Sequence, residues 1–418
     1  MSIPSLASGH EGGVLDQIQG YFRRVKNGEM GALPAIGALI FLTGLFASLS
    51  PFFLTKLNFA NLFVQAAQLA MLAAALVFVL LLAEIDLSAG VTAGVAMAAF
   101  FLLLRDGWNW VIALGVAFMV GALVGFIIGF FVAKVGIPSF VITLGFFLGF
   151  QGVQLILLGE GGLFRVDVPE IKAIMNANLP EIGGWIMLIA VLAIAAALGF
   201  FDRFRRAKKN LPNRPVVFLV AKLGFIALGG GIVIYILNEN RSVSVLPISG
   251  VPIVIPIALA VLILATLLLD RTQFGRHLYA VGGNAEAARR AGIKVNRVKI
   301  MAFMIASTLA VLSGLFHVSR IGAVEATAGR TIVLSAVAAA VVGGVSLFGG
   351  KGRIAHAVIG ALVIVMIDNG LGLLGLPAGV NFLVTGTVLA AAATIDAVSR
   401  KRGGSGLFRR RRPSKVAE

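Results

Sequence analysis

Amide side chains at helical spacing are the first residues here that could bind a ligand. Asn61, Gln65 and Gln68 are separated by four and then three residues, so they lie on one face of a helix. Each amide offers hydrogen-bond donors and acceptors, a combination that suits a hydroxyl-rich ligand. Amides also join neighbouring helices inside membranes. The spacing predicts a shared face and leaves its role open between ligand binding and helix packing.

Carboxylates in apolar surroundings form a second set. The stretch "EIDLSAG" contains Glu84, Asp86 and Ser88. A carboxylate at the centre of a bilayer costs roughly 2.5–3.5 kcal/mol, so such a group normally faces protein or water. One interpretation is a broken helix that lines a polar pathway. The other is a tight turn in which Asp86 caps the next helix by accepting hydrogen bonds from free N–H groups.

A third set combines a carboxylate with two amides. Asp368 and Asn369 lie near one end of an apolar span, and Asn381 begins the next span. An ionisable group in such a span is a functional hypothesis by default. The candidate residues of a translocation pathway are therefore Asn61, Gln65, Gln68, Asp86, Ser88, Asp368, Asn369 and Asn381.

Motifs for catalysis or for cofactor binding are missing from the sequence. The chain has no cysteine, and His277, His317 and His356 show no metal-ligand spacing, so each is interpreted as structural. The stretch "GVSLFGGKGR" resembles a phosphate loop only superficially. It lacks the first glycine of that motif, and Gly352 stands where a Ser or Thr is required. We therefore expect no catalytic site, no metal and no ATP site in this chain.

The elements that carry these residues are membrane-spanning helices. Of 418 residues, 59% are hydrophobic and 13% are charged, and the mean hydropathy is +1.00. A soluble chain of this length needs more polar surface. Many apolar runs are long enough to cross about 30 Å of hydrocarbon. We predict an all-α polytopic membrane protein with about twelve spans, near 33–49, 62–83, 87–104, 110–133, 137–158, 185–201, 216–238, 252–269, 300–317, 332–349, 354–374 and 380–397.

The distribution of positive charge sets the orientation. The formal charge is +17, which in a soluble protein would point to nucleic acid. If the amino terminus lies in the cytoplasm and the spans alternate, 28 of the 35 lysines and arginines fall on the inner side. This bias predicts a multi-pass protein of the bacterial cytoplasmic membrane with both termini inside, and no nucleic-acid partner. The first 30 residues have no apolar core, so we expect no signal peptide.

The two ends of the chain are polar. Residues 14–26 place apolar side chains on one helical face, which predicts a helix lying along the inner membrane surface, with a disordered tail as the alternative. Residues 400–418 form a basic tail that we expect near anionic headgroups. The predicted domains are the amino-terminal tail 1–30, the transmembrane domain 31–399 and the basic tail 400–418. The transmembrane domain divides into a first half 31–160, an extra helix pair 185–238, a second half 250–399 and a cytoplasmic segment 270–299.

Two stretches of the chain resemble each other. Residues 79–94 align without gaps with residues 340–355, so that Leu87 matches Leu347 and Gly90 matches Gly350. Both stretches run in the same direction in the predicted topology. The match therefore predicts a parallel repeat, with two halves related by an axis near the membrane normal.

A polar segment, "AVGGNAEAARRAGIKVNRVK", interrupts the apolar sequence over residues 280–299. Asn284 can cap a short helix over residues 285–291, and Gly292 can end it in the left-handed conformation. A helix this short is unstable alone, so it needs a docking partner, either this chain or a groove on a separate cytoplasmic protein. The candidate docking residues are Gly282, Gly283, Asn284, Glu286, Ala287, Ala288, Arg289, Arg290 and Gly292.

Three segments carry a resemblance to a known family. Segments of the permeases of bacterial ABC-type sugar importers resemble "GRHLYAVGGNAEAARRAGIKVNRVK", "EIDLSAG" and "VVGGVSLFGGKGRIAHAVIGALVI" in this chain. The resemblance covers roughly residues 58–160 and 250–397. It is to the ribose, galactoside and xylose group, and the extra pair of spans over 185–238 is most similar to xylose-type permeases.

The resemblance implies a complex of several chains. A second permease chain, expected as a homodimer, would complete the pathway. Cytoplasmic ABC ATPase subunits, which bind ATP and Mg, would dock on residues 284–292. An extracytoplasmic sugar-binding protein would deliver a monosaccharide, with a pentose such as xylose or ribose favoured. The implied fold is the ten-helix parallel repeat of vitamin B12 permeases plus the extra pair. Glu84 departs from the family pattern, which usually has Gly there.

A different class of transporter remains as the alternative. An ion- or proton-coupled secondary transporter would use Glu84, Asp86 or Asp368 as the carrier of the coupling ion. A membrane enzyme is disfavoured because the sequence shows no catalytic constellation.

Overall fold

The computed structural model describes residues 31–211, 213, 215–242 and 245–405, and these residues belong to two compact units. The larger unit holds residues 31–177 and 252–398, and the smaller unit includes residues 178–251. Every candidate site residue from the sequence lies in the larger unit. The predicted surface helix at 14–26 and the end of the basic tail lie outside the described residues.

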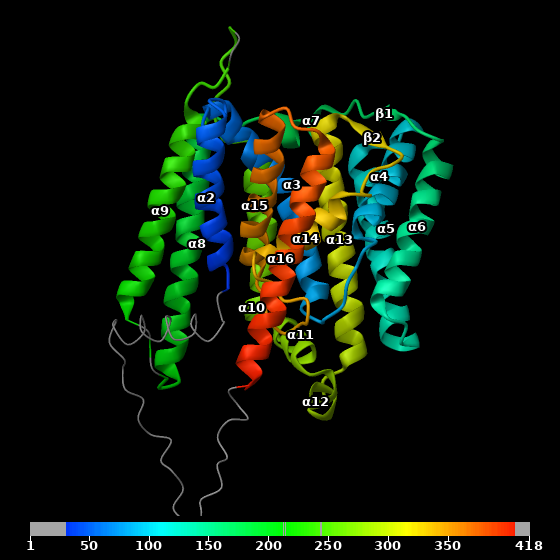
Figure 1. The fold of residues 1–418 in the computed structure, drawn as a ribbon, viewed down its shortest axis with the longest axis vertical. Coiled ribbons are helices and arrows are strands. Elements are labelled where there is room, and N and C mark those ends of the chain that lie inside the picture. Colours follow the sequence, from blue (N-terminus) through cyan, green and yellow to red (C-terminus); the bar gives the residue numbers. More distant parts are fainter. Residues whose placement is uncertain (1–30, 212, 214, 243–244, 406–418) are drawn as a thin grey trace, which may run out of the picture. The chain divides into compact units, whose positions relative to one another are not determined.

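Helices make up nearly all of both units (Figure 1). Only two short strands, β1 and β2, interrupt them among the described residues. The elements in chain order are α2 (Leu33–Leu49), α3 (Lys56–Leu80), α4 (Ala89–Arg105), α5 (Trp110–Phe130), the π-helical turn η1 (Phe131–Val135), α6 (Ser139–Leu158), β1 (Leu163–Arg165), α7 (Pro169–Asn176), α8 (Glu181–Lys208), α9 (Val216–Asn238), α10 (Val254–Arg271), α11 (Gln273–Gly283), α12 (Ala285–Arg290), α13 (Val295–Ile321), β2 (Ala323–Glu325), α14 (Ile332–Val342), α15 (Ile354–Leu373) and α16 (Ala378–Ser405).

Eight of the described helices are long and apolar enough to cross a membrane, namely α3, α5 with η1, α6, α8, α9, α10, α13 and α15. Four shorter apolar helices, α2, α4, α14 and the apolar part of α16, occupy the other predicted spans. The sequence predicts a full span over 332–349, and this is wrong. Helix α14 has 11 residues and ends at Val342, so it is about 16 Å long, roughly half of the hydrocarbon thickness.

Helix α3 forms the centre of the larger unit. Every residue from Ala66 to Leu80 is buried, and the helix packs against α10, α13, α14 and α15. A helix that is apolar on all sides has no face for water, so such a sequence stays inside a bundle. The helix ends at Leu80, and Ala83 adopts a left-handed φ of 60° that turns the chain toward α4.

Small residues bring α5 against α13. Gly121, Gly125 and Gly129 recur every fourth residue and face Val311, Phe303 and Ile300 of α13. A Cβ atom at Gly125 would lie 2.5 Å from the carbonyl oxygen of Phe303, closer than real Cβ atoms approach. Such small-residue stripes are how helices associate where lipid removes the hydrophobic driving force. The two backbones therefore contact each other directly, which fixes α13 as a rigid wall of the bundle.

The two strands hold the carboxyl end of α13. Strand β1 pairs antiparallel with β2, with Leu163 opposite Glu325 and Arg165 opposite Ala323. Beside them, the side chain of Asn176 donates a hydrogen bond to the carbonyl oxygen of Ser319 at 2.7 Å. Because the strands join segments about 160 residues apart, the position of Glu325 depends on tertiary structure.

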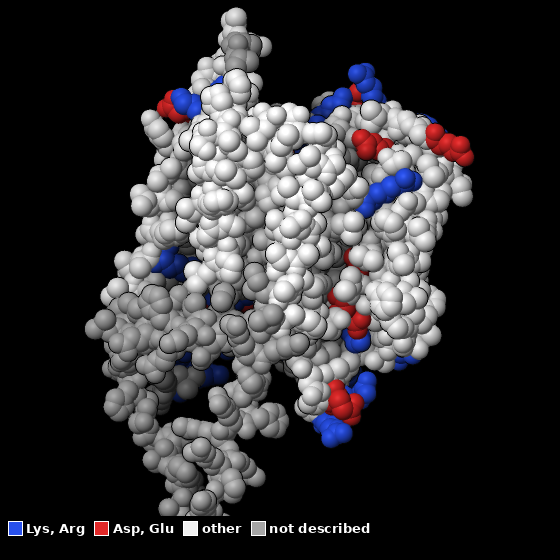
Figure 2. All heavy atoms as spheres, viewed as in Figure 1, with Lys and Arg blue, Asp and Glu red and all other residues white. Residues whose placement is uncertain are grey.

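Charged side chains gather near the ends of the helices. Figure 2 shows an uncharged surface along the length of α2 and over most of α16, and a cluster of both signs at α12. Large apolar side chains of α5 and α6 are exposed, among them Met119, Leu123 and Leu148. An apolar band with charged ends is the surface that a bilayer requires.

The smaller unit contains the helix pair α8 and α9. Glycine brings these two helices together, because Gly199 lies against Leu219 and Gly230 against Leu188. A buried arginine closes the unit at one end. Arg241 donates hydrogen bonds to the carbonyl oxygen of Gly250 at 3.0 Å and to other acceptors of the unit.

Candidate functional site

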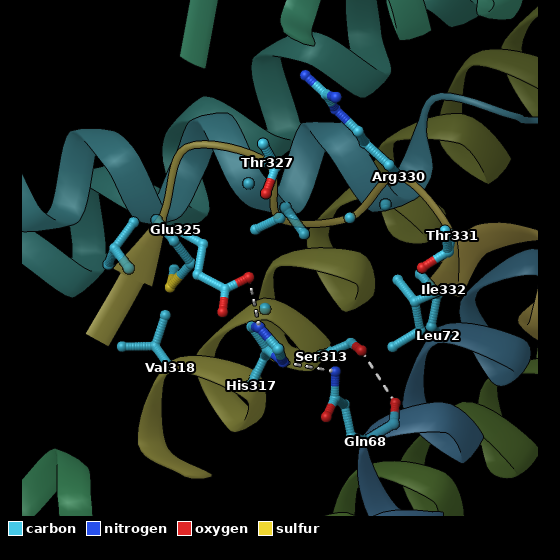
Figure 3. A pocket seen from close by; sticks show the side chains of 18 residues that line it. Gln68, Leu72, Ser313, His317, Val318, Glu325, Thr327, Arg330, Thr331 and Ile332 are labelled. Carbon is cyan, nitrogen blue, oxygen red and sulfur yellow. Dashed lines mark hydrogen bonds and ion pairs between the residues drawn. The ribbon is translucent and has the colours of Figure 1, made fainter. Parts of the chain in front are cut away.

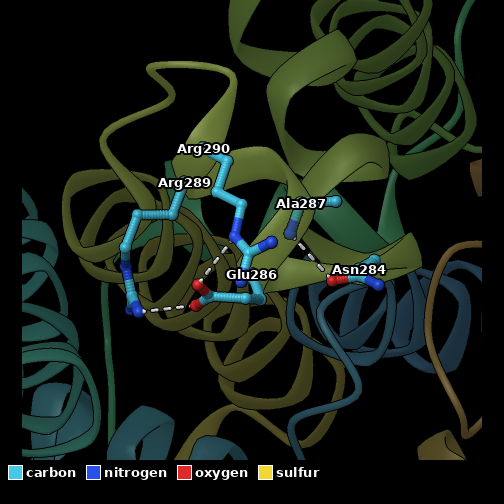
Figure 4. A network of polar contacts seen from close by, with 5 residues as sticks. All are labelled: Asn284, Glu286, Ala287, Arg289 and Arg290. Atoms are coloured by element: carbon cyan, nitrogen blue, oxygen red, sulfur yellow. Dashed lines mark hydrogen bonds and ion pairs between the residues drawn. The ribbon is translucent and has the colours of Figure 1, made fainter.

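The short polar helix α12 forms where the sequence predicts it. It spans Ala285–Arg290, and the side chain of Asn284 accepts a hydrogen bond from the backbone N–H of Ala287 at 2.9 Å. Gly292 follows in the left-handed conformation, with φ of 83°. Glu286 pairs with Arg289 and Arg290 on the surface of the helix (Figure 4). The cap and the glycine are local signals, which explains why the sequence was sufficient to place this helix.

Only one face of α12 is used by this chain. Ala288 is buried, 4% exposed, whereas Ala287, Arg289 and Arg290 are exposed. The ion pairs with Glu286 are also exposed, so each adds little stability. Among the described residues, the outward face of α12 therefore has no packing partner. The sequence left open whether this chain or another protein holds the helix, and the structure accounts for the inward face alone.

Directly before α12, three segments meet through backbone contacts. A Cβ atom at Gly282 would lie 1.7 Å from the carbonyl oxygen of Leu81, so only glycine fits there. The backbone N–H of Gly350 donates a hydrogen bond to the same carbonyl oxygen at 2.9 Å. Tyr279 adds a hydrogen bond from its hydroxyl to the carbonyl oxygen of Gly352 at 2.8 Å. We call this contact of Leu81, Gly282 and Gly350 the glycine junction. It joins the three segments that carry the family resemblance.

The side chains of Glu84, Lys299 and Tyr279 reinforce the glycine junction. The ammonium group of Lys299 on α13 pairs with the carboxylate of Glu84, which follows the turn at Ala83. The side chains are 22% and 13% exposed, so the pair is largely shielded from water. Burial raises the pKa of Tyr279, so its phenol stays protonated and remains a donor at physiological pH.

Asp86 lies in a turn, as one of the two interpretations of "EIDLSAG" predicts. Its Oδ1 atom accepts hydrogen bonds from the backbone N–H of Ser88 at 2.9 Å and from the hydroxyl of Ser88 at 2.6 Å. Both residues are buried, and α4 begins at Ala89 immediately afterwards. The pair therefore organises the start of α4, and neither residue lines the cavity described below.

The amides and carboxylate near Asn369 contact one another. Asn58 and Asn369 exchange two hydrogen bonds, of 2.9 and 2.8 Å, between α3 and α15. The side chain of Asn381 on α16 lies beside the carboxylate of Asp368. These interhelical contacts fit the packing interpretation of such groups. Glu84, Asp86 and Asp368, the carriers required by an ion-coupled transporter, each have a partner within the larger unit.

A cavity of about 140 Å³ lies between α3, α4, α13 and the segment from β2 to the start of α14. Of the three amides that share a predicted face, Gln68 lines this cavity, while Gln65 is half-buried and Asn61 is exposed outside it. The polar residues around the cavity are Gln68, Ser313, His317, Glu325, Thr327, Arg330 and Thr331. Apolar and small residues of α3, α4, α13 and α14 complete the wall.

Four side chains form a continuous polar line across this cavity (Figure 3). The hydroxyl of Ser313 donates to the backbone carbonyl of Gln68 at 2.9 Å, and the amide nitrogen of Gln68 lies 3.2 Å from Nδ1 of His317. Nε2 of His317 lies 3.8 Å from Oε2 of Glu325. If the amide donates to Nδ1, the ring carries its proton on Nε2, facing Glu325. The separation of 3.8 Å exceeds a hydrogen bond, so both groups keep capacity for another partner.

Glycines form the floor of the cavity. A Cβ atom at Gly329, where φ is 87°, would lie 2.0 Å from the carbonyl oxygen of Gly90. A Cβ atom at Gly90 would in turn lie 2.3 Å from the carbonyl oxygen of Gly329. The segment between β2 and α14 therefore touches the start of α4 with its backbone, and any side chain would separate the two.

Sequence reasoning missed most of this cavity. His317 was interpreted as structural, and Ser313 and Glu325 were not singled out. One signal was present, because Ser313 and His317 are four residues apart and share a helix face. The position of Glu325 follows from the pairing of β2 with β1, which no local pattern predicts.

A bundle of apolar helices that encloses a polar cavity defines a polytopic membrane transport protein. The chain belongs to the permease family described as "Branched-chain amino acid transport system / permease component", which matches residues 58–393. It is a multi-pass protein of the bacterial cytoplasmic membrane, as its sequence predicts, and an ABC-type permease of the group that contains the xylose and ribose permeases.

Curated relatives cover most of the chain. It is 34% identical over 359 residues to the xylose transport system permease protein XylH of Escherichia coli, covering 84% of this chain and 87% of that protein. Its identity to XylH of Haemophilus influenzae is also 34%, covering 84% and 91%. The ribose import permease protein RbsC of Bacillus subtilis is 30% identical over 383 residues, covering 91% and 98%. No solved structure matches the chain.

Proposed function

We propose that this chain is the transmembrane pore subunit of an ATP-driven importer for a monosaccharide, with a pentose such as xylose or ribose favoured. The observation that carries this proposal is the similarity to xylose and ribose permeases over 84–91% of the chain. The polar cavity inside the larger unit supports a pathway for a small hydrophilic substrate. The ion-coupled alternative has less support, because its candidate carboxylates are occupied by partners within the unit.

Energy would reach the pore through α12. The helix has an outward face without a partner among the described residues, and its inward face is anchored by Ala288. A separate cytoplasmic ATPase subunit, which would bind ATP and Mg, would seat this face in a groove, with Ala287 allowing close approach and the charged residues forming a polar rim. Through the glycine junction, a displacement of α11 and α12 would then move the loops that contain Leu81 and Gly350. The transport cycle would be a population shift between inward-open and outward-open states.

The complete importer would contain three further components. A second copy of this permease would complete the pathway as a homodimer, two ATPase subunits would bind on the cytoplasmic side, and an extracytoplasmic sugar-binding protein would deliver the substrate. The chain itself would hold no cofactor.

The test of the coupling role is a bulky substitution on the outward face of α12. In Ala287→Trp we expect transport to fall about tenfold, because a blocked seat forfeits on the order of 1.4 kcal/mol or more of docking free energy. ATPase co-purification and sugar-stimulated ATP hydrolysis should fall with it. The control is Ala207→Trp, which adds the same bulk at an exposed alanine near the end of α8.

Both variants are compared with the unchanged chain at matched membrane levels. If Ala287→Trp retains normal ATPase association and normal uptake, α12 has no coupling role. If no ATPase co-purifies with the unchanged chain under conditions that preserve other importer complexes, the proposed function itself is wrong.

A further inference from the structure

The cavity beside His317 has the features of a built binding site. Its polar groups come from α3, α13, β2 and the segment before α14, so the fold brings together residues between 68 and 331. Gln68 is 7% exposed and Ser313 is 3% exposed, so both are held by surrounding packing. The hydrogen bonds between Ser313, Gln68 and His317 fix their orientation. A preorganised polar line of this kind binds a ligand without first paying for side-chain ordering.

Hydrogen-bonding groups with unused capacity lie mainly at the Glu325 end of this polar line. Among the described residues, the carboxylate of Glu325 has only the 3.8 Å contact with His317. The hydroxyl of Thr327 is exposed and points toward the line in Figure 3. Glu325 therefore offers acceptors, His317 and Thr327 offer donors, and Gln68 offers both.

Apolar groups complete the cavity. Leu72, Met97 and Ile332 contribute to its wall, and the contact of Gly90 with Gly329 forms its floor. A site that offers both hydrogen-bonding groups and apolar side chains suits a ring whose hydroxyls lie at its edge and whose C–H groups form a face. The volume of about 140 Å³ corresponds to about five water molecules at roughly 30 Å³ each, which is room for a small ligand.

We infer that this cavity is a binding site for a monosaccharide within the permease, with Gln68, His317 and Glu325 hydrogen-bonding the sugar hydroxyls. The inference rests on the proposed function and names the residues that select the substrate. It places substrate recognition away from Asn369, Asp368 and Asn381, which do not line the cavity.

A free amino acid is the competing ligand, because Glu325 and Arg330 could in principle hold its two charges. The side chain of Arg330 leads away from the line formed by Gln68, His317 and Glu325 in Figure 3. The ammonium group of a zwitterion could pair with Glu325, but its carboxylate would meet no guanidinium group on this line. A neutral polyol needs no such cation, so the geometry favours the sugar.

The absence of cysteine from the chain permits a direct binding test. Thr327→Cys places one thiol at the exposed edge of the cavity, and Glu160→Cys places one at an exposed position outside it. Each variant, in the importer complex in lipid nanodiscs, reacts with a small thiol-specific reagent with and without saturating xylose or ribose. We expect the sugar to slow modification at 327 about threefold or more, the effect of occupying two thirds of the sites, and to leave the rate at 160 unchanged.

Measurements of sugar uptake are the second test of the proposed binding site. Gln68→Leu and Glu325→Gln should each lower sugar uptake by about tenfold, since a lost hydrogen bond to a hydroxyl is worth roughly 1.4 kcal/mol in such a site. Uptake is compared at matched membrane levels of each variant. Thr308→Val is the matched control, because Thr308 lies on α13, bonds only its own helix and does not line the cavity.

The outcomes separate the two proposals. Protection at 327 by sugar, together with selective loss of uptake in the cavity variants, supports the site. Protection by a neutral amino acid instead of by sugar overturns it. If the unchanged complex imports sugar while neither xylose nor ribose protects position 327, and the cavity variants import normally, the inference fails and the proposed function stands. If the unchanged complex imports no sugar, both fail.

Discussion

The ion pair between Glu84 and Lys299 offers a quantitative test of how the glycine junction is held. Replacing either partner with glutamine removes one charge and leaves the other in a site where the two side chains are only 13% and 22% exposed. A fully exposed pair contributes about 0.2–1 kcal/mol, and breaking a fully buried one costs about 3–5 kcal/mol. The intermediate exposure predicts a cost of about 2 kcal/mol for each single variant.

The double variant, Glu84→Gln with Lys299→Gln, should cost less than the sum of the single variants. It removes both charges together, so no uncompensated charge remains, and two amides of similar shape can still hydrogen-bond. We expect the double variant to be more stable than additivity predicts by roughly 1–2 kcal/mol, which lies within the range of about 0.5–3 kcal/mol for residues in direct contact.

The measurement is unfolding of the purified permease in mixed micelles with increasing sodium dodecyl sulfate, followed by circular dichroism. Lys172→Gln is the control, because Lys172 forms an exposed pair with Asp167, 43% and 72% exposed, and its loss should shift the transition far less. If the effects of Glu84→Gln and Lys299→Gln add within about 0.5 kcal/mol, the two groups do not interact, and the reasoning from burial is refuted.

Two further predictions concern topology and packing. Reporters fused after residues 172 and 208 should lie outside and inside, respectively, because the positive charges fall on the inner side in the predicted orientation. If both lie on the same side, the span over 185–201 and with it the twelve-span topology are wrong. Asn369→Leu should destabilise the permease by about 1–3 kcal/mol, because it leaves the amide oxygen of the buried residue Asn58 without its donor. Adding Asn58→Leu should recover part of that loss with uptake per folded molecule unchanged, and a specific loss of uptake in the double variant would instead place the pair in the pathway.

The parts of the fold that the sequence predicted correctly depend on local signals. The position of α12 follows from Asn284 as a cap and from Gly292, and the ranges of most apolar helices follow from hydrophobic runs. The hydrophobic run did not predict where α14 ends. Apolar residues continue to Leu347, but the helix stops at Val342 because Gly343 and Gly344 turn the chain, with φ of 103° at Gly344.

The candidate site was only partly predictable from the sequence. Which polar side chains reach the cavity depends on their contacts with residues distant in sequence. Three amides share the same predicted face, yet only Gln68 meets His317, whose position on the packed helix α13 is a tertiary property. For Asp86 the local interpretation holds. Its Oδ1 atom accepts two hydrogen bonds from Ser88, two residues away, so a tight turn accounts for this part of a motif that also suggested a pathway.

The aligned glycines of the two resembling stretches take different contacts. Gly90 meets Gly329 at the floor of the cavity, whereas Gly350 binds Leu81 at the glycine junction. The helices before them also differ, since α3 has 25 residues and α14 has 11. The alignment therefore compares loops that perform different structural roles, and the predicted parallel repeat stays a prediction.

Those two contacts lie at the ends of one short segment, residues 81–90. Leu81 at its start touches the glycine next to α12, and Gly90 at its end forms part of the cavity floor. Between them, Lys299 holds Glu84 from α13, and the turn of Asp86 and Ser88 makes the second part of the segment rigid. A stiff connector of ten residues cannot absorb a displacement at one end by local bending. If an ATPase moves α12, the cavity floor must therefore respond or the contacts at Leu81 must break.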